Sequence, residues 1–361
     1  MKAALLADRS WLMGELATLR RLVVGLVDDQ VRVVRVVPED IGVAQDDALA
    51  ITSTELHYRW SPWRWIRDWA LRQLRENLRE AEVDVLHVLD GSLCAAGMQL
   101  GQQLNIPVIC SVWSQQEIDQ LPMPPADVTL AIAAPTRALT ERCRRRLSGS
   151  GAVVEYIPAG VYRSTSEQSP PLADPSQTLS CVVAGDGRLD AMYAGLLEAM
   201  AEVRDQLAHA VYFLHSVSSD QHRLWQMAER LKLLDQVSLV PHEPGSRQLL
   251  VQADVVIQPQ PLGQVRTLVL EAMAAGRPVI ATLDPMLDYL IDQRTAKLLQ
   301  EPTADDWTSV LKALVEQPAA FVELGQTARE YVGQHHSAGR YVEHTLTLYR
   351  RLAAKPLPFR R

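Results

Sequence analysis

The sequence is poor in the features that mark secreted, membrane-spanning and metal-binding proteins. Its four cysteines, Cys94, Cys110, Cys143 and Cys181, form no C-x-x-C pair and are too few to staple a small secreted scaffold. We therefore expect buried thiols in a reducing cytoplasm. No apolar run reaches the roughly 18 residues that a membrane-spanning helix needs. The nine histidines show no H-E-x-x-H spacing, so we expect neither a metal site nor a cofactor.

An excess of positive charge is also missing. Lysine and arginine number 36 against 43 aspartates and glutamates, which gives a net charge of -7. Duplex nucleic-acid binders usually carry the opposite balance, so we expect no nucleic-acid partner. The 47% of hydrophobic and 22% of charged residues are typical of a soluble globular protein and exclude a disordered or collagen-like chain.

The chain does contain a regular alternation of short apolar runs and longer amphipathic stretches. This alternation is typical of parallel sheets with helices on both faces. It predicts strands at residues 3–7, 31–37, 83–89, 107–112, 128–132, 153–157, 179–184, 210–215, 237–240, 254–257 and 278–281. Three consecutive helical patterns, at 305–316, 319–332 and 340–352, then predict a helical tail.

The length of 361 residues predicts two domains, since a domain usually has roughly 100 to 200 residues. We expect an α/β fold of two doubly wound Rossmann-like domains that face a cleft. Residues 164–177 hold three prolines and no apolar periodicity, which is typical of a linker. The expected domains are then 1–163 and 178–335, followed by a C-terminal helix at 336–361 that packs back toward the N-terminal domain.

One segment carries a specific resemblance. Residues 271–281, EAMAAGRPVIA, closely resemble the helix-turn-strand signature of retaining GT-B glycosyltransferases, especially glycosyltransferase family 4. Weaker resemblances to the same family occur elsewhere. They lie at Gly14-Glu15, which partly match the family's glycine-rich turn after the first strand, and at 83–87, 157–161, Gly187-Arg188 and 253–257 with Pro259.

The resemblance implies a nucleotide-sugar donor on the C-terminal domain and an unidentified acceptor on the N-terminal domain, with transfer that retains the anomeric configuration. It implies a ribose contact for Glu271 and a base-binding loop at His242. Gly263 and Gln264 would lead into a helix whose N-terminal N–H groups favour a diphosphate, with Arg188 as a cation. Arg266 stands where the family prefers glycine, and in the first turn of this helix its guanidinium could reach a phosphate. The alternative interpretation is that Glu271 is a surface carboxylate, His242 a loop histidine, Arg188 a salt-bridged arginine and Arg266 a solvated arginine.

Three positions depart from the family pattern. Gly263 stands where the family has its first motif glutamate, which contacts the donor sugar. Tyr193 stands where the family usually has a lysine that neutralises the diphosphate, and Trp113 where it often has a histidine beside the donor sugar. Gly14, Glu15 and Trp113 remain the expected cleft residues, and no catalytic residue is assigned. The departures leave three alternatives open: an enzyme with rewired donor contacts, an inactive relative that binds a sugar or a partner protein, and an epimerase on the same fold.

Half of the eight tryptophans lie between residues 60 and 69, among arginines. On a helix, Trp65 and Trp69 fall away from the apolar face and close to Arg72, with Arg75 nearby. Such an element suits an anionic membrane surface, so we expect a cytoplasmic protein that can associate with a membrane. The alternative is that the rings pack against loops and the arginines are solvated.

Overall fold

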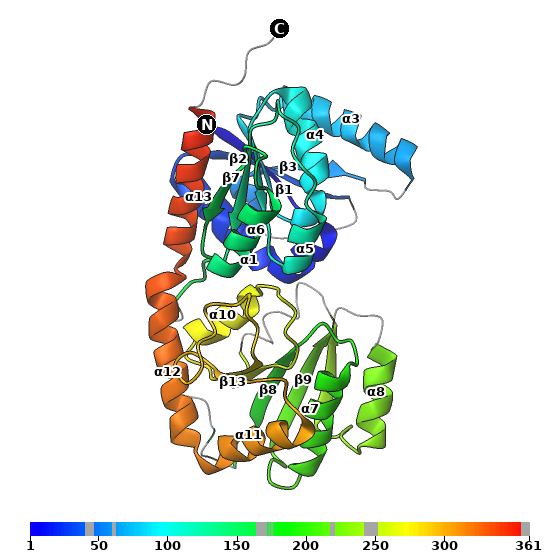
Figure 1. Cartoon of the computed structure of the whole chain (residues 1–361), viewed down its shortest axis with the longest axis vertical. Coiled ribbons are helices and arrows are strands. Elements are labelled where there is room, and N and C mark those ends of the chain that lie inside the picture. The colour runs from blue at the N-terminus through cyan, green and yellow to red at the C-terminus, as the bar shows by residue number, and fades with distance from the viewer. Residues whose placement is uncertain are drawn as a thin grey trace. The chain divides into compact units, whose positions relative to one another are not determined.

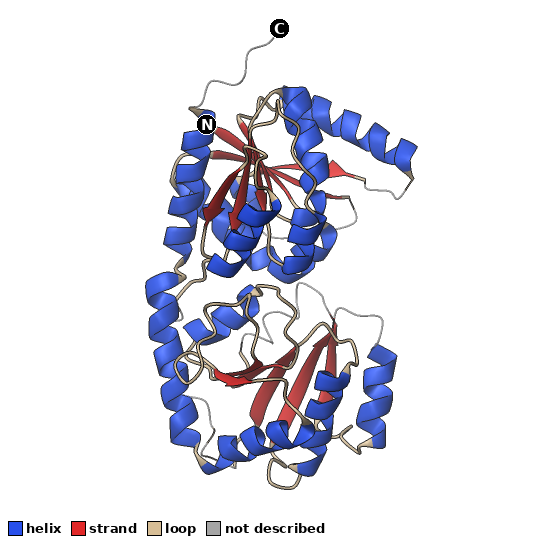
Figure 2. Cartoon of the chain, viewed as in Figure 1, coloured by secondary structure: helices blue, strands red, loops and turns tan. Residues whose placement is uncertain are grey.

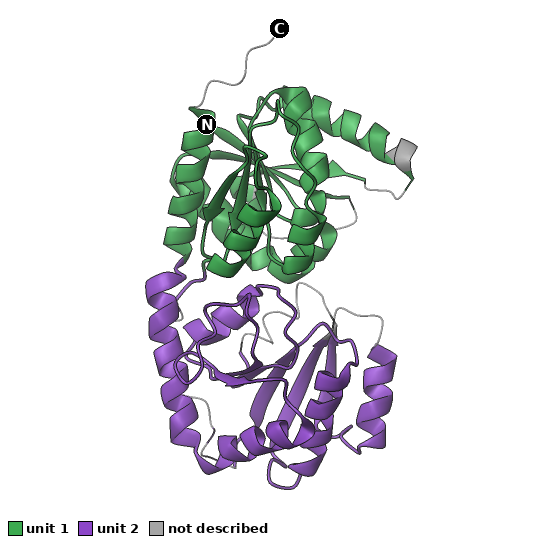
Figure 3. Cartoon of the chain, in the orientation of Figure 1, with its two compact units in different colours: residues 1–160, 338–361 green, residues 161–337 purple. Residues whose placement is uncertain are grey.

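The chain folds into two compact units, which are residues 1–160 with 338–361, and residues 161–337 (Figure 3). The computed structural model describes residues 1–39, 47–59, 63–163, 172, 174, 176–216, 221–241 and 252–354. Each unit is built on one parallel sheet that carries helices (Figure 2). The predicted pair of doubly wound sheets is therefore confirmed, and the C-terminal helices are present.

The first unit contains a seven-stranded parallel sheet in the order β3-β2-β1-β4-β5-β6-β7. Its strands are β1 (Lys2–Leu6), β2 (Arg32–Pro38), β3 (Thr54–Tyr58), β4 (Val85–Val88), β5 (Val108–Ser111), β6 (Leu130–Ala134) and β7 (Val153–Tyr156). Its helices are α1 (Arg9–Asp28), α2 (Asp47–Thr52), α3 (Arg64–Glu80), the 3-10 helix η2 (Gly91–Leu93), α4 (Cys94–Leu104), α5 (Gln115–Gln120), α6 (Arg137–Arg146) and α13 (Ala338–Ala353). Figure 1 shows α3 extending outward from the sheet.

The second unit contains a six-stranded parallel sheet in the order β10-β9-β8-β11-β12-β13. Its strands are β8 (Leu179–Ala184), β9 (Ala210–Ser216), β10 (Val237–Pro241), β11 (Val255–Gln258), β12 (Val279–Thr282) and β13 (Lys297–Leu299). Its helices are α7 (Ala191–Glu202), α8 (Gln221–Arg230), α10 (Thr267–Ala274), α11 (Ala304–Glu316) and α12 (Pro318–His335).

Both sheets reverse their strand order at one point. The reversal lies between β1 and β4 in the first unit and between β8 and β11 in the second. The loops that leave the carboxyl ends of these strands diverge to opposite faces of the sheet, which opens a crevice where ligands of doubly wound folds usually bind. The switch point of each sheet is therefore where a site is sought.

All eleven predicted strands occur near their predicted positions, and two further strands were missed. The central strands were predictable because both faces are covered, so that β4, for example, is buried along its whole length. The edge strand β3, TELHY, mixes exposed and half-buried polar side chains and gives no apolar run. The three-residue β13 is too short to leave a pattern.

The last helix, α13, contributes to the core of the first unit. The Tyr349 hydroxyl lies 2.7 Å from Nδ1 of the buried His87, whose Nε2 lies 2.8 Å from the Ser111 hydroxyl. Burial lowers the pKa of His87 to about 3, so the ring is neutral and acts as a satisfied core residue. A Cβ on Gly25 of α1 would come within 2.5 Å of Val342 of α13, so the two helices pack in close contact.

Most of the expected linker, residues 164–171, 173 and 175, lies outside the described residues. Leu172, inside the same stretch, is buried in the core of the second unit together with Leu179 and Leu196. In the described part of the chain, no helix is long and apolar enough to cross a bilayer.

Candidate functional site

The switch point of the second unit carries a connected set of polar contacts centred on Gln260. This side chain follows β11, is 1% exposed, and crosses to the loop that leaves β8. Its Oε1 accepts from the Asp186 N–H at 3.1 Å, and its Nε2 donates to the Arg188 carbonyl at 3.1 Å and to the Asp190 carboxylate at 2.6 Å. Leaving a buried amide without one of its hydrogen-bond partners costs free energy. These three hydrogen bonds therefore hold the 185–190 loop in place against the exit of β11.

Arg266 makes a second tie across the same switch point. Its Nη1 donates to the Gly185 carbonyl at 2.7 Å. Arg266 is the N-cap residue of α10, one position before the first turn in which the sequence predicts it, and its side chain makes no cap hydrogen bond. The guanidinium therefore lies where the exit of β8, the exit of β11 and the start of α10 meet.

Tyr193, which occupies the family's lysine position, packs against Gly185 at the exit of β8. Tyr193 is fully buried in α7, and its hydroxyl has no hydrogen-bond partner among the described residues. A Cβ on Gly185 would lie 2.5 Å from the Tyr193 ring, so only glycine allows this backbone approach. Burial raises the pKa of Tyr193, which keeps the phenol neutral.

The residue in the family's first glutamate position is held by a neighbouring carboxylate. Gly263 is buried with a φ of 60°, in the left-handed region that favours glycine. Its N–H donates to Asp284 Oδ2 at 2.7 Å, and the Met286 N–H donates to Asp284 Oδ1 at 2.9 Å. Burial raises the pKa of Asp284, which is 5% exposed and follows β12.

The other predicted donor contacts lie on or beside the same elements. Gln264 and Glu271 are half-buried, Gln264 before α10 and Glu271 within it. Arg188 is 66% exposed, and its Nε donates to the Asp186 carboxylate at 2.6 Å. That contact is the salt bridge expected in the alternative interpretation of Arg188. His242 lies outside the described residues.

The expected cleft residues of the first unit lie on elements that follow β1 and β5. Gly14 and Glu15 do not form a turn after β1, because α1 already begins at Arg9 and is kinked at Glu15, where φ is -124°. Trp113 is 3% exposed and donates its Nε1–H to the Leu89 carbonyl at 2.8 Å. This bond leaves the indole no N–H to offer a ligand.

The carboxylate of the half-buried Glu117 joins the exits of β4 and β5. Its Oε2 accepts from the Gly91 N–H at 2.9 Å and the Trp113 N–H at 3.0 Å, and its Oε1 accepts from the Ser114 hydroxyl at 2.9 Å. Burial, and then the charge of Asp90, raise the pKa of Glu117 to about 7 against the lowering effect of these donors.

We expect Glu117 to make the protein less stable as the pH rises from about 5 to 8. The folded state holds this proton up to about pH 7, whereas the unfolded chain releases it near its ordinary pKa of 4.5. The unfolded state thus binds fewer protons in this window, and the free energy of unfolding falls by roughly 1 to 3 kcal/mol. Urea unfolding of the wild type and of Glu117→Gln at several pH values isolates this contribution. Identical pH slopes for the two proteins would contradict it.

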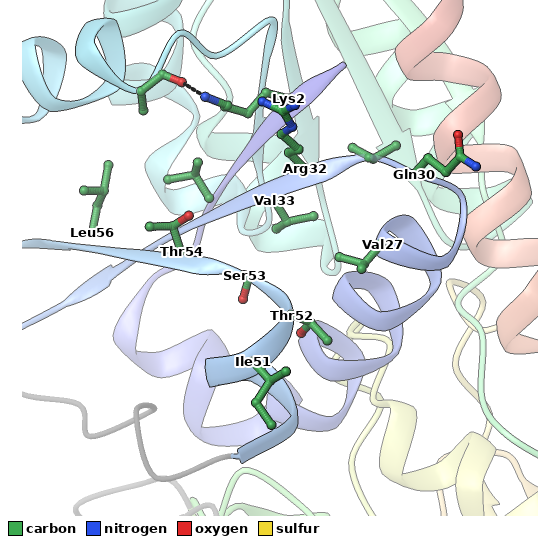
Figure 4. A pocket seen from close by; sticks show the side chains of 13 residues that line it. Lys2, Val27, Gln30, Arg32, Val33, Ile51, Thr52, Ser53, Thr54 and Leu56 are labelled. Carbon is green, nitrogen blue, oxygen red and sulfur yellow. Dashed lines mark hydrogen bonds between the residues drawn. The ribbon is translucent and has the colours of Figure 1, made fainter.

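A hollow that the structure describes in the first unit lies elsewhere. A space of about 720 Å³ opens beside Lys2 and Arg32, at the amino ends of β1 and β2 (Figure 4). The side chain of Lys2 donates there to the Ala81 carbonyl. Because the hollow lies at the end of the sheet opposite the switch-point loops, it is not the candidate site. No group of three or more metal-ligating side chains occurs among the described residues.

Sequence reasoning missed the three side chains that organise these edges, namely Gln260, Asp284 and Glu117. Each lies in a loop or short helix after a buried strand, as ligand-binding residues of parallel sheets often do. Gln260 lies two residues after β11, and Asp284 two after β12. Their position after a predicted strand was the available signal.

Comparison with known families identifies both halves of the chain. Residues 14–171 match the family "Glycosyl transferase 4-like domain", and residues 171–317 match the family "Glycosyl transferases group 1". A curated relative from Arthrobacter sp. (strain FB24), a D-inositol 3-phosphate glycosyltransferase, is 38% identical over 77 residues. That match covers 21% of this chain and 18% of the relative, so only a short stretch of sequence is shared.

Solved structures match the whole chain. A sucrose-phosphate synthase from Thermosynechococcus elongatus has a TM-score of 0.76 at 18% identity, over 98% of this chain and 100% of that one. The Anabaena protein HepE, in complex with UDP-glucose, has a TM-score of 0.76 at 14% identity and the same coverage. At these identities the likeness concerns the fold alone. With both family matches, it shows that the chain belongs to the group 1, glycosyltransferase family 4-like glycosyltransferases of the GT-B fold.

Proposed function

We propose that the protein is a metal-independent glycosyltransferase that moves a sugar, with retention, from a nucleotide-sugar donor to an acceptor. The observation that carries the proposal is the joined surface at the switch point of the second unit. Gln260 and Arg266 hold the exits of β8 and β11 together beside the start of α10. Backbone N–H groups at a helix start and a guanidinium both favour a diphosphate.

The roles of individual residues follow from this placement. A diphosphate at the start of α10 lies next to Arg266, and a ribose lies one turn further along the helix, within reach of Glu271. Arg188 is largely exposed, so its guanidinium can exchange Asp186 for a phosphate at little cost. Stabilising the charge of the leaving nucleotide is the main work of such a site, and each good contact accounts for about 100- to 1000-fold in rate.

Calorimetry with nucleotides tests the proposal. UDP is the first probe, because HepE holds UDP-glucose and the family fold is shared; ADP and GDP complete the panel. A ligand that binds only the folded state raises the melting temperature, by an amount set by its concentration over Kd. Failure of every nucleoside diphosphate to raise it would overturn the proposal and favour the inactive, partner-binding relative.

Product analysis separates transfer from isomerisation. Proton NMR of the anomeric signals of UDP-glucose, with and without a panel of polyol acceptors, reports both the fate of the donor and the configuration of the product. Transfer consumes the donor only with an acceptor or, slowly, with water. An epimerase converts it into an isomer without any acceptor.

We further propose that α3 places the protein on an anionic membrane surface. Trp63 and Trp69 are 67% and 55% exposed, and Arg72 is exposed one turn after Trp69. The side chain of Trp65 lies outside the described residues, and Arg75 is partly neutralised by Glu76, which it contacts. Exposed aromatic rings among cations suit the headgroup region of a bilayer.

We expect Trp63→Ser with Trp69→Ser to weaken binding to vesicles of phosphatidylglycerol and phosphatidylcholine by about tenfold. Each ring carries roughly 150 to 250 Å² of surface, and even partial insertion of both gives more than 1.4 kcal/mol. Vesicle sedimentation measures the effect. Trp225→Ser is the matched control, because Trp225 is 39% exposed on α8 of the other unit. Equal retention of the double variant and the control would contradict the role of α3.

A further inference from the structure

A buried carboxylate lies beside the position whose side chain is missing. We propose that Asp284 recognises the hydroxyl groups of the donor sugar, in place of the glutamate that the family carries at the position of Gly263. The inference rests on the proposed function. It adds to that function a specificity-determining residue that the sequence pattern does not reveal.

The backbone at Gly263 explains why the carboxylate comes from another loop. A φ of 60° is strained for a residue with a side chain, so this conformation of the loop favours glycine over glutamate. The conformation also turns the Gly263 N–H toward Asp284 Oδ2, at 2.7 Å. The loop therefore has no carboxylate of its own at residue 263, and the Gly263 N–H binds the carboxylate of Asp284 from the exit of β12.

Asp284 is held in a fixed orientation with hydrogen-bonding capacity left over. One N–H donor reaches each of its oxygens, from Gly263 and from Met286. Each carboxylate oxygen has a second acceptor position. In the described part of the chain no Lys, Arg or His side chain forms an ion pair with it, and burial disfavours its charge. Additional hydroxyl donors would stabilise such a group.

The location matches the chemistry of a sugar rather than that of a nucleotide. Gly263 precedes Arg266 by three residues, so the carboxylate lies beside the loop that leads to the proposed diphosphate site. A carboxylate next to a diphosphate would repel it, whereas the hydroxyl groups of a hexose donate to carboxylates. The alternative is that Asp284 only ties two loops together, which would affect the nucleotide and the sugar alike.

Titration calorimetry with paired ligands distinguishes the two roles. UDP and UDP-glucose, ADP and ADP-glucose, and GDP and GDP-mannose are titrated into the wild type and into Asp284→Asn. For the pair that the wild type binds, we expect the nucleotide sugar to lose 10- to 100-fold in affinity while the nucleoside diphosphate stays within twofold. Equal losses for both ligands, or no loss, would overturn the role of Asp284.

Two further variants keep the test interpretable. Asp284→Glu retains the charge, and we expect it to keep more of the sugar's contribution than Asp284→Asn does, so it decides the matter if Asp284→Asn fails to fold. Asp292→Asn is the matched control, because Asp292 also binds a backbone N–H, that of Leu298 at 2.9 Å, and leads to β13. If the wild type binds no ligand of the panel, the proposed function fails first and this inference fails with it.

Discussion

Gly325→Ala is expected to destabilise the second unit by about 3 kcal/mol, at the upper end of what overpacking usually costs. A Cβ at this position would lie 2.2 Å from the Gly276 carbonyl oxygen and 3.1 Å from the Pro278 nitrogen. Both neighbours are backbone atoms, so relief requires α12 to move away from the turn that ends α10. Overpacking that displaces backbone costs more than a side-chain adjustment.

Gly333→Ala on the same helix is the control for this prediction. Nothing lies within 4 Å of a Cβ at Gly333, so the substitution should be neutral or should stabilise the protein by up to about 1 kcal/mol through helix propensity. Urea unfolding followed by tryptophan fluorescence measures both variants, with the fully buried Trp307 as a reporter in the second unit. Similar free energies for the two variants would show that α12 yields easily at Gly325.

The consequence for function is local. Gly276 is part of the signature EAMAAGRPVIA, and its φ of 75° ends α10 in the left-handed conformation typical of a helix C-terminus. The same turn leads into β12 and so to Asp284. Displacing it moves two sides of the candidate site at once, so we expect Gly325→Ala to weaken nucleotide binding beyond its effect on folding.

The architecture could be predicted because parallel sheets covered by helices produce a regular alternation of apolar strands and amphipathic helices in the sequence. The buried strand β6, LAIAA, is a continuous apolar run, and the signature at 271–281 fixes a helix, a turn and a strand together. The helix starts were less readable. For α1, Asp8 was an available N-cap signal ahead of Gly14, since its side chain accepts from the Ser10 N–H, but the kink at Glu15 was not predicted.

The contacts around the candidate site were less readable than the architecture. Gly263 gives no sign in the sequence that a carboxylate from residue 284 binds its N–H, because the contact spans two loops that meet only through the order of β11 and β12. Trp113 could be recognised as a departure, but its partner Leu89 comes from a different strand exit. Long-range pairings of this kind depend on topology, which a local pattern does not contain.

Arg266→Ala is expected to lower the rate of sugar transfer 100- to 1000-fold, about 3 to 4 kcal/mol, if the proposed function holds. The guanidinium has two roles at this position. It ties Gly185 to the start of α10 through the 2.7 Å bond, and in the proposed function it brings a positive charge to the place where the leaving diphosphate develops its charge. Conservative variants separate the roles. Arg266→Gln keeps a neutral donor and Arg266→Lys keeps the charge without the planar fork. If the charge matters most, Lys retains more activity than Gln; if the tie matters most, the ranking reverses and the melting temperature falls with it.

Arg204→Ala is the matched control, since Arg204 pairs with Asp235 at 2.6 Å just beyond the C-terminal end of α7, at the opposite end of this helix from the site. A rate for Arg266→Ala close to that of the control would show that the Arg266 guanidinium takes no part in sugar transfer.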